Sequence, residues 1–439
     1  MSAKRLLLKG GRVVDPAAGR DGEFDVLIED GRVARIGKAL PAEGAEVMDL
    51  ASGWIVTPGL IDLHVHLREP GQEHKETIAT GVGSAVAGGF TAVACMPNTD
   101  PVNDHPGITE LILRRAAAAG LARVYPIGAV SIGSKGEQMA ELGAQKAAGC
   151  VAFTDDGRPV ANALLMRRAL EYAGMLGVPI VDHCEDPSLK GDGVAHEGLI
   201  AGRLGLRGIP GIAESIMVER DIALAELTGG PYHVCHMSAR QSLRAVRAAK
   251  ARGMTNVTCE VAPHHFVLTD QSLESPIRYD TNVKMNPPLR EAADRDAMLE
   301  GIADGTVDVI ATDHAPHHAD EKLVEFDRAP FGIVGLETCV PLVFDRLVRA
   351  GRITIGRAIE LLSTNPAKVF RLPGGTLAEG GPADITVIAP DAPVVVRAAA
   401  LKSKSKNTPF DGWQLRGAVA ATIVGGRIVY RSDTYEQNR

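Results

Sequence analysis

The sequence predicts an α/β fold, a TIM-like (β/α)8 barrel over residues 58–374, with a small β-sandwich domain formed by residues 1–57 and 375–439. In the middle of the chain short apolar stretches alternate with helical ones, whereas both ends contain strands separated by glycine- and proline-rich turns. Polar side chains also follow nearly every apolar stretch of the middle part. A closed barrel with its active site at the strand ends explains this pattern better than an open, doubly wound sheet.

The middle of the chain contains eight expected strand–helix units. The expected strands are 60–66, 90–97, 123–130, 150–155, 178–183, 232–237, 257–262 and 307–312. The expected helices are 75–87, 107–119, 137–148, 160–176, 214–228, 239–252, 291–303 and 338–350. Eight such units in about 300 residues fit one closed barrel.

Both ends of the chain are expected to form strands. The N-terminal runs lie near 6–8, 12–14, 24–28 and 32–36, and the C-terminal runs are 383–388, 393–396 and 422–430. Asp30-Gly31 between two alternating runs is a strong hairpin signal. Neither end alone has enough strands to bury a face, so we expect them to share one domain.

Composition excludes several classes of protein. The 439 residues are 45% hydrophobic and 23% charged, with a net charge of -7 and no basic run to suggest a nucleic-acid partner. No run approaches the ~20 apolar residues of a membrane helix, and the N-terminal apolar run is too short for a signal peptide. The six cysteines form no Cys-x-x-Cys pair, which favours reduced thiols and a soluble, cytoplasmic protein.

The stretch 59–71 gives the strongest chemical signal. His64, His66 and Arg68 alternate along a strand and therefore share one face, with Leu63, Val65 and Leu67 opposite. Two histidines in this spacing can bind one metal ion, and the arginine could hold an anionic substrate beside it. The alternative is an exposed strand with a polar face.

The other strand ends favour the metal interpretation. Eight of the 13 histidines lie at these ends, whereas helices and end domains contain almost none. The candidates at the strand ends, beyond His64 and His66, are Asn98, Asp155, Asp156, His183, His236, His264, His265, Asp313, His314 and His317. Cys184 and Cys235 are expected on the opposite face of their strands, packed against helices.

Imidazole and carboxylate ligands without thiolate suit Zn(II), Mn(II), Co(II) or Fe(II). Four histidines, Asp313 and one more carboxylate are enough for two metals that share a bridging carboxylate, and such a pair lowers the pKa of a shared water toward 7. Asp313 could take the proton of the attacking hydroxide and pass it to a leaving nitrogen. This set predicts metal-assisted amide hydrolysis, or amide formation in reverse.

These residues resemble the amidohydrolase superfamily, and within it the bacterial type I dihydroorotase group. The resemblance rests on Asp62–Gly71, Met96–Thr99, Phe153–Gly157, Lys284–Arg290, Ala311–His317 and Ala329–Gly332, and extends over essentially the whole chain. It implies a hydrolase that catalyses the reversible cyclisation of N-carbamoyl-L-aspartate to L-dihydroorotate in de novo pyrimidine (UMP) biosynthesis.

The resemblance also implies a ligand set. His64 and His66 would bind the first zinc ion, His183 and His236 the second, and Asp313 would bind metal and act as the acid/base. Many superfamily members bridge their metals with a carboxylated lysine on strand four. That strand has no lysine here, so Asp156 is assigned as the bridge, although alternation alone leaves a swap with Asp155 open.

The resemblance assigns further residues to the substrate. Arg68, Asn98 and His317 would grip the substrate carboxylate. Asn286 and the backbone of Ala329, Pro330, Phe331 and Gly332 would contact the pyrimidine ring. The segment 318–328 is expected to be a polar loop over the mouth, either a lid or an ordinary surface loop.

Two other functions are compatible with parts of this pattern. An allantoinase or dihydropyrimidinase would act on substrates without a carboxylate and would typically use the strand-four lysine, so Arg68 and Asp156 argue against it. A non-catalytic homologue that scaffolds aspartate transcarbamoylase would lose metal ligands, and all six are present. A homodimer and an association with aspartate transcarbamoylase are both compatible with the sequence.

Overall fold

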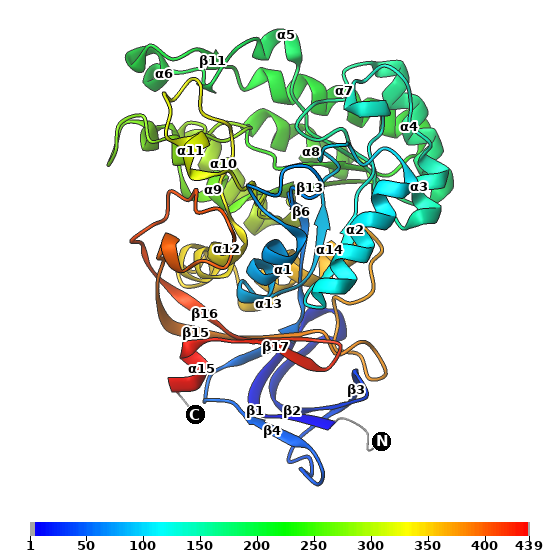
Figure 1. Ribbon diagram of the computed structural model, residues 1–439, viewed down its shortest axis with the longest axis vertical. Coiled ribbons are helices and arrows are strands. Elements are labelled where there is room, and N and C mark those ends of the chain that lie inside the picture. Colours follow the sequence, from blue (N-terminus) through cyan, green and yellow to red (C-terminus); the bar gives the residue numbers. More distant parts are fainter. Residues whose placement is uncertain (1–4, 438–439) are drawn as a thin grey trace.

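The computed structural model describes residues 5–437, with a β-sheet at one end of the molecule and an α/β body above it (Figure 1). The outermost residues of the predicted terminal domain, 1–4 and 438–439, lie outside the described part. Within that part, none of the helices has the length and apolar character needed to cross a membrane.

Strands from both ends of the chain share one eight-stranded sheet. Its order is β17-β16-β15-β5-β1-β2-β3, with β4 paired to β1. Its strands are β1 (Arg5–Asp15), β2 (Arg20–Glu29), β3 (Arg32–Gly37), β4 (Glu46–Asp49), β5 (Ile55–Pro58), β15 (Ile385–Val395), β16 (Gln414–Val424) and β17 (Arg427–Arg431). The antiparallel pairing of β5 with β15 joins the two ends of the chain.

The predicted hairpin at Asp30-Gly31 is confirmed. Both residues have positive φ, 48° and 80°, and they join β2 to β3 in the primed turn that this dipeptide favours. The first part of β16, residues 414–421, was not predicted. Half of these residues are glycine or alanine, which have weak strand propensity, and their strand conformation depends on pairing with β15.

The α/β body contains parallel strands in two hydrogen-bonded groups, β6-β7-β8 and β14-β13-β12-β9. Their bounds are β6 (Leu60–Val65), β7 (Phe90–Cys95), β8 (Arg123–Pro126), β9 (Ile180–Asp182), β12 (Tyr232–Val234), β13 (Val257–Val261) and β14 (Val309–Ile310). Single parallel bridges join the groups: Phe153 pairs with Gly128 and Ile180, and His314 pairs with Val65.

The strand predicted over 150–155 is wrong in extent, because only Phe153 makes bridges there. The Val151 N–H donates to Pro126 O, and the Phe153 N–H donates to Pro179 O. The Val181 N–H returns a hydrogen bond to Phe153 O, but the pairing on either side does not continue into a ladder long enough for a strand. The segment is extended and anchored on both sides instead.

The eight predicted helices are all present, with shifted ends. They are α1 (Ile78–Ala87), α2 (Pro106–Ala119), α3 (Leu142–Ala148), α4 (Ala163–Leu176), α7 (Ile212–Thr228), α8 (Arg240–Ala251), α10 (Ala292–Asp304) and α12 (Leu336–Val343). The last continues as a π-helical turn over Phe344–Val348. Gly120 and Gly177, with φ of 61° and 70°, end α2 and α4 as helix-terminating glycines commonly do.

Several short elements were not predicted. They are α5 (Pro187–Lys190), β10 (Ala195–His196), α6 (Leu199–Leu204), β11 (Gly208–Ile209), α9 (Pro263–Val267), α11 (Ala319–Lys322), α13 (Ile355–Ile359), α14 (Asn365–Val369) and α15 (Asp433–Gln437). The first four form an excursion after β9. In Figure 1 this excursion lies at the end of the molecule opposite the terminal sheet.

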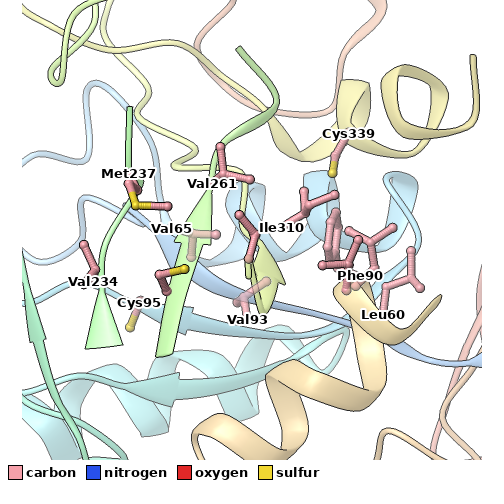
Figure 2. Packing of buried hydrophobic residues seen from close by; sticks show 14 of the residues in the cluster. Leu60, Val65, Phe90, Val93, Cys95, Val234, Met237, Val261, Ile310 and Cys339 are labelled. Atoms are coloured by element: carbon pink, nitrogen blue, oxygen red, sulfur yellow. The ribbon is translucent and has the colours of Figure 1, made fainter. Parts of the chain in front are cut away.

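Alternate side chains of the parallel strands pack in different clusters. One cluster lies between strands and helices and includes Val65, Phe90 and Val261 (Figure 2). A second contains Leu63, Ala94, Val181 and Cys235. The expectation that Leu63 lies on the same side as Val65 is wrong, because a register irregularity between Asp62 and Val65 breaks the alternation of β6.

Candidate metal centre and substrate cavity

A cavity of about 320 Å³ lies where the parallel strands end. Five of the six predicted metal ligands line it, and the sixth, His64, is fully buried beside them. The lining residues are His66, Arg68, Asn98, Asp156, Gly157, His183, Lys190, His236, Met285, Asn286, Asp313, Ala315, His317, Pro330 and Phe331. Segments far apart in sequence therefore meet here, as the strand-end argument predicted.

Asp156 lies at the centre of the predicted ligand set. Its Oδ1 is 3.6 Å from His64 Nε2, His183 Nδ1 and His236 Nε2. Its Oδ2 is 3.6 Å from His66 Nε2. One carboxylate thus faces both predicted histidine pairs, which is the geometry that a bridging ligand needs.

Asp313 approaches the same nitrogens from another side. Its Oδ1 is 3.1 Å from His66 Nε2 and 3.5 Å from His64 Nε2. Burial raises the pKa of a carboxyl group, but the imidazoles of His64, His66 and His236 outweigh it and hold the pKa of Asp313 below its ordinary value.

The atoms that converge here fit divalent metal ions. His64 Nε2 and Asp156 Oδ1 are buried without a hydrogen-bond partner, whereas buried polar atoms are normally paired. His183 Nδ1 and His236 Nε2 face each other at 2.9 Å. Imidazole nitrogens and carboxylate oxygens are common ligands of zinc in proteins.

The adjacent aspartates Asp155 and Asp156, at the end of the expected fourth strand, have opposite environments. Asp155 accepts hydrogen bonds from the Ser131 N–H at 2.9 Å and from the Ser131 hydroxyl, and burial raises its pKa to about 6. Burial acts on Asp156 too, but His64, His183 and His236 bring its pKa well below the ordinary value. Of the two carboxylates that the sequence left open, Asp156 is the one turned toward the imidazoles.

The backbone at three site residues has an unusual conformation. Arg68, His236 and Asp313 have positive φ values of 62°, 25° and 47°. Residues with a side chain rarely adopt this region, and where they do, the surrounding structure must hold them there. All three lie two or three residues after the end of a strand, namely β6, β12 and β14.

Oxygen atoms behind the histidines fix their ring orientation. His64 Nδ1 donates to Glu260 Oε1 at 2.7 Å, and His66 Nδ1 donates to Asn98 Oδ1 at 2.9 Å. Such partners leave the other ring nitrogen free to bind metal. Sequence reasoning missed Glu260. A carboxylate inside the apolar run 257–262 was the available signal, because a buried charge needs a partner.

Arg68 and His317 form the polar side of the cavity. Arg68 Nε donates to Pro316 O at 3.1 Å, and its Nη2 donates to His317 Nε2 at 3.2 Å. Burial lowers the pKa of Arg68 to about 10, which leaves the guanidinium charged at neutral pH. Burial and the neighbouring Arg68 also lower the pKa of His317, so this imidazole is neutral. Asn98 lies beside them, with Nδ2 3.4 Å from Asp156 Oδ2.

The remaining predicted substrate residues divide into two groups. Asn286, Pro330 and Phe331 line the cavity, whereas Ala329 and Gly332 do not. Asn286 Nδ2 is 3.1 Å from His183 Nε2, and its Oδ1 is buried without a partner. The Gly332 N–H donates to Lys284 O, and a Cβ at Gly332 would come within 2.5 Å of Ala315 O.

Lys190 is a cavity residue that the sequence did not indicate. It belongs to the short helix α5 in the unpredicted excursion after β9. Its Nζ donates to Glu185 Oε2 at 2.6 Å and lies 5.6 Å from the centre of the Phe331 ring. Glu185, two residues after His183, faces His183 Nε2 at 3.4 Å.

The segment 318–331, which we call the strap, is anchored by two buried lysines. Lys322 Nζ donates to Thr281 O at 3.0 Å and Pro330 O at 2.8 Å. Lys284 Nζ donates to Phe326 O at 2.7 Å and Asp327 O at 3.1 Å. Burial lowers the pKa of Lys322 to about 7 and that of Lys284 to about 8. The strap is therefore tied to the residues around 281–284 through its backbone.

Of the other strand-end histidines, His265 and His314 have local partners, whereas His264 Nε2 is buried without a hydrogen-bond partner. His265 Nε2 donates to Pro287 O at 2.9 Å, and His314 Nδ1 accepts from the Gly335 N–H at 3.2 Å. Cys184 packs on the helix side, as expected. The same expectation for Cys235 is wrong: its Sγ belongs to a group with the ligand atoms of His64, Asp156 and His236 in which all atoms lie within 4.8 Å of one another.

Known proteins and family models match nearly the whole chain. The model of a family described as dihydro-orotase-like matches residues 53–242, and that of the amidohydrolase family matches residues 230–430. A protein named dihydroorotase from Pelotomaculum thermopropionicum is 57% identical over 97% of this chain and 98% of its own. Another from Anaeromyxobacter dehalogenans is 58% identical over the same shares.

Solved structures with the same architecture are also found. The L-hydantoinase (dihydropyrimidinase) from Arthrobacter aurescens has a TM-score of 0.84 at 25% identity, covering 97% of this chain and 96% of its own. The D-hydantoinase (dihydropyrimidinase) from Thermus sp. has a TM-score of 0.81 at 28% identity, covering 97% and 95%.

Proposed function

The chain belongs to the dihydroorotase family of cyclic amidohydrolases, and from that premise we propose how its cavity works. The reaction is the reversible cyclisation of N-carbamoyl-L-aspartate to L-dihydroorotate in pyrimidine biosynthesis. The observation that supports this assignment most is the meeting of four imidazoles on Asp156 beside a buried, charged Arg68. Such a cavity combines amide chemistry with recognition of an anion.

Two zinc ions per subunit would be held by side chains of the cavity floor. The residues that would hold them are His64, His66, Asp156, His183, His236 and Asp313. When bound, zinc supplies Lewis-acid chemistry, because it polarises a carbonyl oxygen and lowers the pKa of water. Asp156 would bridge the pair, since each of its oxygens faces an imidazole nitrogen at 3.6 Å.

Asp313 would act as the acid/base. His64, His66 and His236 keep this carboxyl group ionised despite its burial, so it can accept a proton. The proton held on Asp313 can then be delivered to the ring nitrogen that leaves the carbonyl when dihydroorotate opens. In the cyclisation direction, the same carboxylate takes the proton from the attacking carbamoyl nitrogen.

Arg68 and His317 would bind the substrate carboxylate. A guanidinium recognises a planar anion through two parallel hydrogen bonds, and Arg68 Nη2 reaches only a neutral imidazole in this structure. Asn98 borders the same side of the cavity. Asn286 Oδ1, which has no partner, would accept a hydrogen bond from a ring N–H, and Pro330 and Phe331 would cover the ring.

The neighbouring activity of a hydantoinase or dihydropyrimidinase is the second candidate, because solved structures of such enzymes share the architecture. Its substrates have no carboxylate to accompany Arg68. Ring opening of L-dihydroorotate, allantoin and dihydrouracil, followed by loss of ultraviolet absorbance on zinc-loaded protein, tests both candidates. We expect rapid opening of dihydroorotate alone. Opening of dihydrouracil or allantoin in its place would assign the chain to the sister enzymes.

Three further proposals concern organisation. The parallel pairings and the single bridges at Phe153 and His314 support a closed (β/α)8 barrel over 58–374, with the terminal segments as a separate domain. We place the enzyme in the cytoplasm. A homodimer and a complex with aspartate transcarbamoylase are both compatible assemblies. Sedimentation of the chain alone and mixed with the transcarbamoylase distinguishes them.

A further inference from the structure

Glu260 on β13 is a buried carboxylate that touches both proposed histidine pairs. It is 1% exposed. Its Oε1 accepts from His64 Nδ1 at 2.7 Å and from the backbone N–H of His236 at 3.2 Å. His64 belongs to the pair proposed for the first metal and His236 to the pair proposed for the second.

The contact with His64 determines the tautomer of that imidazole. An ionised carboxylate can only accept hydrogen bonds, so His64 Nδ1 must be the protonated nitrogen. His64 Nε2 then presents its lone pair toward Asp156 and Asp313, at 3.6 and 3.5 Å. A carboxylate behind an imidazole also raises the basicity of the nitrogen that binds metal.

The contact with His236 acts on the backbone. His236 has a φ of 25°, a conformation that a residue with a side chain keeps only when its surroundings hold it. Its ring nitrogen Nδ1 has no hydrogen-bond partner. The hydrogen bond from its N–H to Glu260 is therefore a main constraint on where this side chain points.

A second histidine holds the other carboxylate oxygen. His233 Nε2 donates to Glu260 Oε2 at 3.2 Å, and the Thr258 hydroxyl lies 2.7 Å from His233 Nδ1. In the neutral imidazole with Nε2 protonated, His233 Nδ1 accepts from that hydroxyl. Glu260 thus receives three N–H donors, two from imidazoles and one from the backbone, which compensates for burying its charge.

We propose that Glu260 is a positioning residue that couples the two halves of the metal centre. It fixes the tautomer of His64 and the backbone of His236 through a single oxygen atom. Its loss should therefore weaken both metals together. This inference rests on the metal site proposed above, and the experiment separates the two.

The experiment titrates metal-free protein with zinc against a chromophoric chelator and extracts the two stepwise affinities. Glu260→Leu removes the acceptor and Glu260→Gln keeps one acceptor oxygen without the charge. We expect both affinities to fall about 10- to 100-fold in Glu260→Leu, the range typical for loss of a partner behind a metal ligand. Glu260→Gln should show a smaller, parallel fall. The absorption spectrum of the cobalt-substituted protein should change in both variants.

Glu76→Gln is the matched control. Glu76 is also a fully buried carboxylate beside an imidazole, with its Oε2 3.4 Å from His314 Nε2, but it contacts none of the proposed ligands. This variant should keep both zinc affinities even where its thermal midpoint falls. A purely structural role for Glu260 would make the two carboxylates behave alike.

Three outcomes would overturn the proposal. They are zinc affinities within twofold of the parent in both Glu260 variants, a fall confined to one of the two steps, and an equal fall in Glu76→Gln. If Glu260→Leu does not fold, Glu260→Gln decides alone by the same criteria. His64→Asn tests the site itself: if it keeps both affinities, the metal site is wrong, whatever Glu260 does.

Discussion

The floor and the roof of the cavity are stabilised in different ways. The floor is made of side chains from strand ends that contact one another away from solvent: His64, Asp156 and His236 are at most 3% exposed. The roof, the strap 318–331, is held through backbone carbonyls by Lys284 and Lys322. The floor is suited to binding cations at fixed positions, whereas the hold on the roof depends on two ammonium groups that burial makes easier to deprotonate.

The first test of the floor is Asp313→Asn. Asparagine has nearly the shape of aspartate but cannot carry the proton, so zinc content should stay largely intact while kcat for ring opening falls about 10²- to 10⁴-fold. The measurement pairs steady-state rates with zinc analysis of the same sample. Turnover within a few-fold of the parent enzyme would remove Asp313 from the acid/base role.

The second test uses the two adjacent aspartates. Asp156→Asn should weaken zinc binding by more than the roughly 100-fold expected for residues behind a ligand, because Asp156 faces both histidine pairs. Asp155→Asn is the matched control, since Asp155 contacts Ser131 instead. It should retain zinc, at some cost in stability. Zinc retained in Asp156→Asn and lost in Asp155→Asn would reverse our assignment of the bridge.

The third test moves to the polar side of the cavity. Arg68→Ala should raise the KM for dihydroorotate about 10- to 100-fold, the effect of losing hydrogen bonds to a charged group, with a smaller change in kcat. Arg68→Lys keeps the charge but not the planar fork, and should recover only part of the loss. An unchanged KM in Arg68→Ala contradicts its role at the substrate carboxylate.

The sequence could predict the features of the floor that depend only on neighbouring residues. The spacing of His64 and His66, and the position of Asp313 after its strand, follow from local periodicity, and local periodicity predicts which end of a parallel strand a side chain occupies. The choice between Asp155 and Asp156 was open because both follow the same strand. It depends on the partner Ser131, which lies in another segment.

Other features depend on contacts between distant segments and were missed for that reason. Glu260 acquires its role from His64, 196 residues away. Lys284 and Lys322 look like ordinary polar residues in the sequence, because their burial depends on the packing of the strap against the residues around 281–284. Leu63 and Cys235 were misplaced because strict alternation was assumed, and a register irregularity between Asp62 and Val65 breaks it for Leu63.

The roof should differ from the floor in how its stability depends on pH. Burial lowers the pKa of Lys322 to about 7 in the folded protein, whereas the ordinary value of 10.5 applies in the unfolded chain. Between these values the unfolded chain binds more protons, so the free energy of unfolding contributed by this group rises with pH. Below about pH 7 both states are protonated, and the cost of burying the charge is fully present.

Lys322→Met removes this titration and keeps a side chain of similar length. Relative to the variant, the parent protein should gain stability as the pH rises from 7 to 10, at most about 1.4 kcal/mol for each pH unit. Urea unfolding of both proteins at matched pH and zinc concentration measures the difference, and proteolysis within 318–331 should follow the same trend.

Lys38→Met, at an exposed lysine, is the control and should leave the pH dependence unchanged. A constant difference between the parent and Lys322→Met across this range would mean that Lys322 stays charged in the folded state. The attachment of the roof would then not depend on pH between 7 and 10.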